Sequence, residues 1–123
     1  MTTWANEMRA AALNGMTALL NGGTFRLLDS GASELAAPVF NATAFGAATT
    51  ANPSVATANT FTADSSITAG TIASFELRTS GGSTRVSGSV GVGTGDIPVS
   101  STTIPGTATS VTISGMTISF SLT

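Results

Sequence analysis

Few side chains in this sequence can do covalent or acid–base chemistry. Histidine, cysteine, lysine and tyrosine are absent, which removes most general bases, nucleophile activators and transition-metal ligands. The remaining titratable side chains are four arginines and six scattered acids: Arg9, Arg26, Arg78, Arg85, Glu7, Asp29, Glu34, Asp64, Glu76 and Asp96. Paired carboxylates could hydrolyse a glycoside, but these acids occur singly, beside turns or on the polar side of predicted strands. The sequence therefore predicts no catalytic residue and a protein that is not an enzyme.

Metal and phosphate sites are not predicted either. Calcium needs several oxygen ligands at close spacing, whereas the residues around Asp64 and Asp96 are typical of turns. The spacing of Gly91, Gly93 and Gly95 could suggest a phosphate cradle, but no predicted helix follows it to receive the anion. We expect a hairpin loop there, and no cofactor or small-molecule substrate.

The composition restricts the partners. Charged residues make up 8% of the 123 residues, against about 25% in an average soluble domain. With only four basic residues, the release of counterions that drives binding to nucleic acid has little to act on. Hydrophobic residues make up 41%, and so little charge leaves a monomer poorly protected against association. Burial in an assembly is expected; the alternative is a monomer hydrated by its Ser and Thr side chains.

The first part of the chain is predicted to be one helix, over residues 3–20. Thr2 or Thr3 can cap its start, and Asn21-Gly22-Gly23 supplies the residues that end a helix. Glu7, Asn14 and Thr17 fall opposite an apolar half of the helical wheel, formed by Trp4, Met8, Ala12, Leu13, Met16, Leu19 and Leu20. The apolar stretch 10–20 is interrupted and too short to span a bilayer, and the opening lacks the basic cluster of a secretion signal. We expect no membrane passage.

The rest of the chain is predicted to be β structure. Short runs of β-prone residues alternate with Gly, Pro, Asn and Ser, as in a sandwich or barrel. Pro38 favours an edge strand. Residues 80–83 are predicted to form a hairpin turn that places Glu76 or Arg78 opposite Arg85. Residues 41–53 could be a strand or an arm ordered by a neighbour. The predicted strands are 24–29, 34–40, 55–61, 71–79, 84–92, 97–99, 110–113 and 116–122. The fold class is thus mainly β: a single domain (1–123) in which the helix precedes an antiparallel β-sandwich of jelly-roll or Ig-like type (24–123).

The order of several short motifs resembles a family of small virion proteins of tailed bacteriophages. The helix end at 9–23 is rich in Ala and Leu and closes on Asn-Gly-Gly. Thr-Phe-Arg-Leu-Leu-Asp-Ser-Gly follows at 24–31, Pro-Val-Phe at 38–40 and Ala-Phe-Gly-Ala-Ala at 44–48. An Ala/Thr-rich middle and a Ser/Thr-rich end, with a Gly-containing hairpin at 86–92, complete the pattern, which covers most of the chain.

The resemblance implies a structural role, with capsid decoration or cementing as the first choice. The expected partners are copies of the chain, as dimers or trimers, and the major capsid protein, on the surface of a virion assembled from proteins made in the bacterial cytoplasm. The predicted interface residues are Trp4, Met8, Leu13, Met16, Leu20, Phe40 and Phe45. The alternative is a tail component, in a tube or fibre base, which would form rings or tubes. A glycan-binding module is a third possibility, which would show saturable affinity for a sugar.

Overall fold

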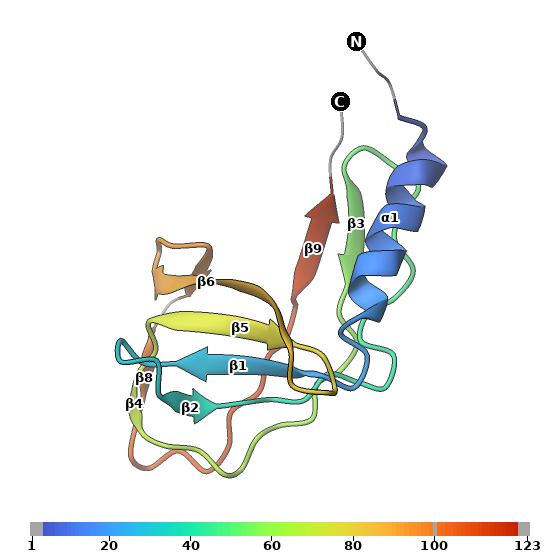
Figure 1. The fold of residues 1–123 in the computed structure, drawn as a ribbon. Helices are drawn as coiled ribbons and strands as arrows, with labels where there is room; N and C mark the ends of the chain where they lie inside the picture. The colour runs from blue at the N-terminus through green and yellow to red at the C-terminus, as the bar shows by residue number, and fades with distance from the viewer. Residues whose placement is uncertain (1–3, 100, 121–123) are drawn as a thin grey trace.

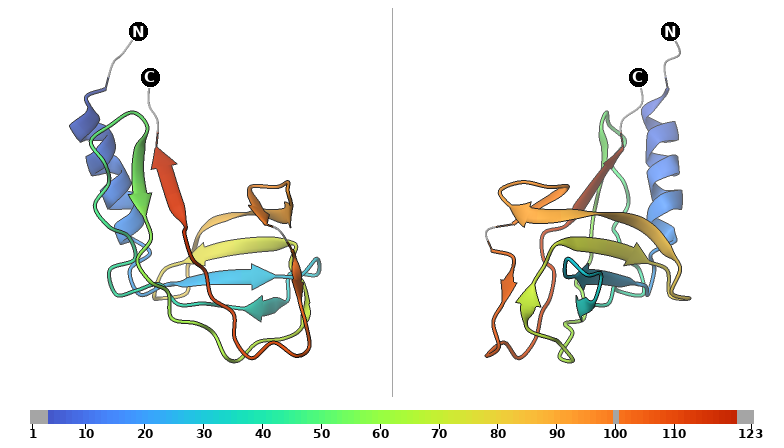
Figure 2. Two further views of the ribbon diagram at one scale, coloured as in Figure 1. Left: turned by 180° about the vertical axis from the view of Figure 1, so that it is seen from behind. Right: turned by 60° about the vertical axis from the view of Figure 1, so that its left-hand side comes forward.

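The computed structural model describes residues 4–99 and 101–120 and is mainly β, with one N-terminal helix, as predicted (Figure 1). In chain order the elements are α1 (Asn6–Ala18), β1 (Thr24–Leu28), β2 (Glu34–Ala36), β3 (Ser54–Thr57), β4 (Gly70–Thr71), β5 (Ser74–Arg78), β6 (Thr84–Val92), β7 (Ile97–Val99), β8 (Thr103–Ile104) and β9 (Thr117–Phe120). Figures 1 and 2 show α1, β3 and β9 rising together from the remaining strands. We call these three elements the arm and the remaining strands the body.

Helix α1 begins and ends inside the predicted range. Its N-cap is Ala5, which makes no side-chain cap; the predicted caps Thr2 and Thr3 lie outside the described residues. Arg9 instead fixes this end, because its guanidinium donates to the carbonyl oxygens of Trp4 at 2.6 Å and Ala51 at 3.2 Å. Beyond the C-terminus, Gly22 has a φ of +67°, a conformation that glycine adopts without steric cost.

Five strands form the main sheet of the body, in the order β2-β1-β5-β6-β7. Strands β1 and β5 are antiparallel, with Phe25 opposite Leu77 and Leu27 opposite Phe75. All four of these side chains are buried, because alternate residues of a strand point to the same face. The predicted hairpin at 80–83 joins β5 to β6, and β2 is an edge strand as Pro38 suggested.

The end of β6 departs from the prediction. The hairpin loop expected around Gly91, Gly93 and Gly95 is wrong, because β7 pairs parallel to the end of β6. Positive φ angles at Gly93 (+67°) and Gly95 (+86°) let the chain fold back on itself within a few residues. The Asp96 carboxylate then holds this loop, since it accepts a hydrogen bond from the Ser89 N–H at 2.9 Å.

The C-terminal third forms less sheet than predicted. Residues 110–113 contribute only an isolated bridge between Asp64 and Val111. The last predicted strand is β9, which pairs antiparallel with β3 and places Ile118 opposite Ala56. Leu122 and the side chain of Phe120 lie outside the described residues.

A two-layer sandwich is not confirmed. In the described residues the strands form separate sheets of five, two and two strands, the smaller ones being β3-β9 and β4-β8. One hydrophobic core nevertheless joins the arm to the body, since Leu13 of α1 and Ala56 of β3 belong to the same cluster as the buried residues of β1 and β5.

Phenylalanines occupy the middle of this core. The closest ring pairs are Phe40–Phe61, with centroids 4.7 Å apart, and Phe25–Phe75, at 5.5 Å. Phe45 joins them through Phe40, at 5.8 Å. Tilted pairs at these distances add about 0.5–1.5 kcal/mol each to the stabilisation from burial. The aromatic residues therefore hold the body together and connect it to the segment beside α1.

Segment 41–53 contains no strand but is ordered by its own chain. The Asn21 side-chain oxygen accepts a hydrogen bond from the Ala44 N–H at 2.8 Å, and that of Asn14 accepts one from the Ala48 N–H at 2.9 Å. Ala44 is fully buried. Polar side chains of α1 and its C-terminal turn thus bind the segment along the helix, and no neighbouring chain is needed for this contact.

Candidate interaction surface

Three of the carboxylates stabilise turns. Asp29 accepts hydrogen bonds from the backbone of Gly31 and Ser33, both at 2.9 Å. Asp64 accepts from Ala37 and Ser66, both at 2.8 Å. The contact of Asp64 with Ser66 and that of Asp96 with Ser89 are the turn chemistry predicted for these two residues, whereas the bond from Ala37 ties Asp64 to a distant segment. No group of three or more acids that could hold a metal occurs among the described residues.

The densest charged cluster is a salt-bridge chain on the polar face of the main sheet. Arg26 contacts Glu34 at 2.7 Å and Glu76 at 2.9 Å, and Arg78 also contacts Glu76 at 2.9 Å. Hydrogen bonding to Arg26, and secondarily to Arg78, holds the pKa of Glu76 below its ordinary value. Hydrogen bonding to Glu34, and then to Glu76, raises the pKa of Arg26. Glu76 therefore pairs with Arg26 and Arg78, and the contact predicted between this hairpin's charges and Arg85 is not formed.

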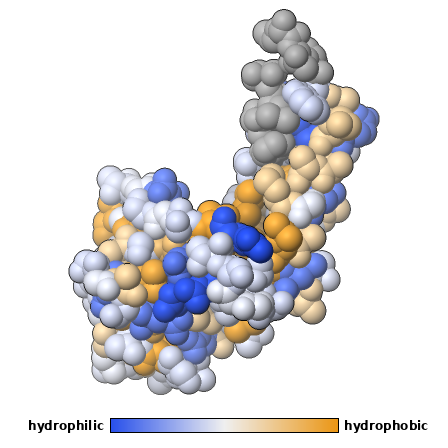
Figure 3. Space-filling model, viewed as in Figure 1, coloured by the Kyte–Doolittle hydropathy of each residue, from blue (hydrophilic) through white to orange (hydrophobic). Residues whose placement is uncertain are grey.

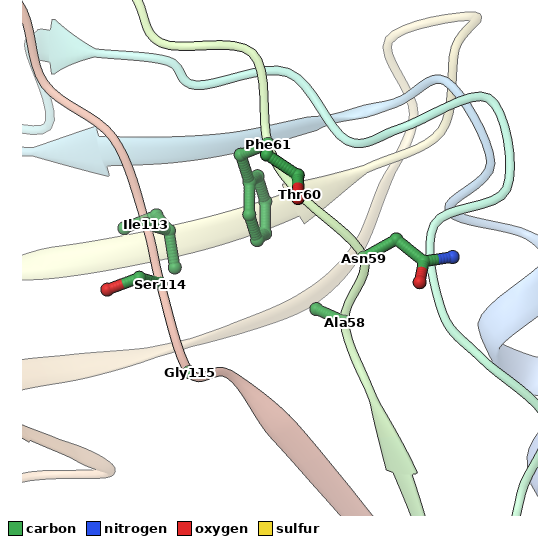
Figure 4. Close-up of a pocket in the computed structure, with 7 residues that line it drawn as sticks. All are labelled: Ala58, Asn59, Thr60, Phe61, Ile113, Ser114 and Gly115. Carbon is green, nitrogen blue, oxygen red and sulfur yellow. The ribbon is translucent and has the colours of Figure 1, made fainter.

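A hollow of about 160 Å³ lies between residues 58–61 and 113–115 (Figure 4). The side chains of Phe61 and Ile113 point toward one another in it, whereas that of Asn59 points away. The Asn59 amide donates to the Thr43 carbonyl at 2.8 Å. No charged side chain lines this hollow, and the Ser114 hydroxyl points away from residues 58–61 in Figure 4, so the hollow has little with which to bind a polar ligand.

The seven predicted interface residues fall into two groups. Four are core residues and are not available on the surface of this chain: Leu13, Leu20, Phe40 and Phe45, all at most 6% exposed. The other three are on the surface, with Trp4 39%, Met8 53% and Met16 44% exposed. The structure brings these three to the arm.

The burial of α1 differs from the predicted wheel. Arg9, Ala10, Leu13 and Thr17 are its buried residues, so Thr17, predicted to lie on the polar side, faces the core. The outward side, opposite them, consists of apolar or small residues: Trp4, Met8, Ala11, Ala12, Gly15, Ala18 and Leu19. We call this set the outer face of α1. Glu7 and Asn14 lie at one margin of it, since each residue advances 100° around a helix.

An apolar hollow of about 220 Å³ adjoins this face where the arm meets the body. It is lined by residues from α1 and the turn after it, from β6 and from β9: Met16, Thr17, Leu19, Leu20, Arg85, Val86 and Ile118. In Figure 3, hydrophobic side chains gather in the concave corner between arm and body. Sequence reasoning found Met16 but missed Val86, because only the tertiary fold brings β6 beside the helix.

No protein family, curated protein or solved structure matches the chain. Within the described ranges, no helix has the length and apolar character needed to cross a membrane.

Proposed function

We propose that this chain is a non-enzymatic structural protein of a tailed-phage virion, and that it decorates the outside of the icosahedral shell. Its partners in this proposal are further copies of itself and the major capsid protein. It would be made in the cytoplasm of the host bacterium and act at the capsid surface.

The observation that carries the proposal is the outer face of α1. Met8 and Leu19 are more than half exposed, and no charged side chain lies on the face between them. An exposed and continuous apolar surface marks a site of interaction in a folded protein. Because only 8% of the residues are charged, little electrostatic repulsion opposes contact between copies.

The carboxylates support a role without catalysis. Asp29, Asp64 and Asp96 each stabilise a turn, and Glu76 is held between two arginines. A general acid would need a raised pKa near the working pH, whereas the pKa of Glu76 is lowered.

The jelly-roll or Ig-like sandwich stays a prediction, to be tested by a structure of the particle-bound protein.

The proposal is tested by adding purified protein to shells of the phage that encodes it, prepared without the gene. We expect saturable co-sedimentation with the shells, and a higher temperature of shell opening, because binding only to the closed shell stabilises it by mass action. Absence of binding, together with rings or tubes of the isolated protein, would replace decoration with a tail role. Saturable binding to a glycan array without shell binding would support a sugar-binding module.

A further inference from the structure

The outer face of α1 has a regular pattern of large and small residues. Trp4 and Met8 are bulky, Ala11 and Ala12 are small, Gly15 has no side chain, and Leu19 is bulky again. A Cβ atom built on Gly15 would meet nothing within 4 Å. There is therefore an open space on the helix surface between two bulky residues.

We propose that the outer face of α1 binds the same face of a second copy, with the two helices antiparallel about a two-fold axis. In this arrangement Met8 of each copy packs over Gly15 of the other. The proposal rests on the self-assembly part of the proposed function and specifies the surface that carries it.

Complementarity of size favours a second copy as the occupant. A two-fold axis between Ala11 and Ala12 brings those two small residues together at the centre and places Met8 opposite Gly15 on both sides. Trp4, which precedes the N-cap Ala5, and Leu19, the C-cap residue, lie at the two ends of the contact. An isologous interface must be self-complementary in this way. Small residues at the centre let two helix axes approach to about 8–10 Å.

Charge favours the antiparallel direction. Glu7 lies at one margin of the face, and Arg85 lines the hollow that adjoins the face at Met16 and Leu19. Antiparallel pairing places the two Glu7 residues nine positions apart along the axis, roughly 14 Å, which exceeds the Debye length of about 8 Å at physiological ionic strength. Parallel pairing would place them at the same height on opposite sides of the contact, and it would align the two helix dipoles side by side in the same direction, which is unfavourable. Arg9 lies on the opposite, buried side and does not interfere.

The fold leaves room for this contact. The arm projects from the body (Figures 1 and 2), so an antiparallel partner would carry its own body at the other end of the helix pair.

Helix α1 has 13 residues and spans about 20 Å, so the contact is smaller than the roughly 800 Å² per partner of a standard interface. We expect a dissociation constant in the micromolar range or weaker for the free protein. On a shell, tethering of both copies would raise their effective concentration.

The direction and register are tested by cysteine cross-linking of the full chain, which has no cysteine of its own. Met8→Cys and Gly15→Cys variants are mixed and oxidised. Antiparallel pairing predicts a mixed disulfide between them, and a second one between Ala11→Cys and Ala12→Cys, because a disulfide forms only when the two Cα atoms lie within about 7 Å. Preferential cross-linking of Met8→Cys to itself would show parallel pairing and overturn the proposal.

The contact itself is tested by Gly15→Leu in sedimentation equilibrium. Leucine is a better helix former than glycine, yet it fills the space that Met8 of the partner needs, so we expect dimerisation to weaken by about tenfold or more while the monomer stays folded by circular dichroism. Gly106→Leu is the matched control, since a Cβ there also meets nothing within 4 Å and lies away from the arm. Equal dimerisation of the Gly15→Leu, Gly106→Leu and unaltered proteins would overturn the proposal.

These experiments distinguish failure of the helix pairing from failure of the proposed shell decoration. A protein that is monomeric at every concentration and gives no cross-link, yet binds shells, refutes the helix pairing and leaves decoration intact. Cross-linked dimers that do not bind shells refute decoration and leave the pairing intact.

Discussion

Replacement of glycine by alanine is expected to raise the stability of the fold at one position of this chain and to lower it at another. At Gly15 an added Cβ meets nothing within 4 Å, and alanine is preferred over glycine within a helix by about 1 kcal/mol. At Gly23 the Cβ would lie 1.9 Å from the carbonyl oxygen of Arg78, which is far inside van der Waals contact. Because that neighbour is backbone of β5, it cannot rotate away as a side chain could.

The size of the loss at Gly23 follows from the contacts that must move. The Gly23 N–H donates to the Leu20 carbonyl at 2.9 Å, and the Gly23 carbonyl accepts from the Phe40 N–H at 2.8 Å. Relieving the clash shifts at least one of these bonds or the end of the β1–β5 pair. Overpacking of this kind costs about 1–3 kcal/mol, and more where backbone is involved. We therefore expect Gly23→Ala to lose about 3 kcal/mol and Gly15→Ala to gain up to about 1 kcal/mol.

Urea unfolding followed by circular dichroism measures both changes. A low protein concentration keeps self-association out of the comparison, and unchanged m-values would show that the midpoints report stability. If Gly23→Ala proves as stable as the unaltered chain, the packing of residue 23 against β5 is wrong. If Gly15→Ala is destabilised by a similar amount, the outer face of α1 is not exposed in the free protein.

Four further outcomes are expected. Phe40→Ala should lose about 3–5 kcal/mol in urea unfolding, because it deletes a ring at the centre of the aromatic core; a loss below 1 kcal/mol would contradict that packing. Glu76→Gln should remove less than about 1 kcal/mol at pH 7. Since the folded pKa of Glu76 is lowered, that contribution is complete above the ordinary glutamate pKa and disappears as the pH falls through the folded value, so the two proteins should converge in unfolding experiments at pH 2. Asn14→Ala should lose about 0.5–1.5 kcal/mol with the hydrogen bond to Ala48 and should raise amide exchange within residues 46–49; unchanged exchange there would contradict that contact. Emission from Trp4, the one tryptophan, should shift to shorter wavelength as the protein is concentrated, and a constant spectrum over a range in which sedimentation shows dimers would place Trp4 outside the contact.

The sequence was sufficient to predict those elements whose structure is decided by local residue patterns. Alternation of buried Phe75 and Leu77 with polar neighbours predicted β5, and the glycines at 81 and 82 predicted the hairpin to β6. The predicted range contained the whole helix and extended a few residues beyond each of its ends. These features depend on residues close together in the chain.

The burial of α1 could not be predicted, because it depends on distant segments. Arg9 is buried since its guanidinium reaches the carbonyl of Ala51, and segment 41–53 is bound along the helix by Asn14 and Asn21. These contacts turn Met8 and Leu19 outward, although the helical wheel groups them with the core residue Leu13. The parallel direction of β7 has a more local origin, because Gly93 and Gly95 adopt positive φ angles and Asp96 contacts Ser89; the glycine spacing by itself did not distinguish this turn from a hairpin.

The most direct test of the proposed role is to image intact phage particles at subunit resolution, with and without the gene. Decoration predicts density that fits the arm and body at regular sites on the outside of the shell, and the loss of that density from particles lacking the gene. Unchanged shells, with the missing density in the tail, would contradict decoration.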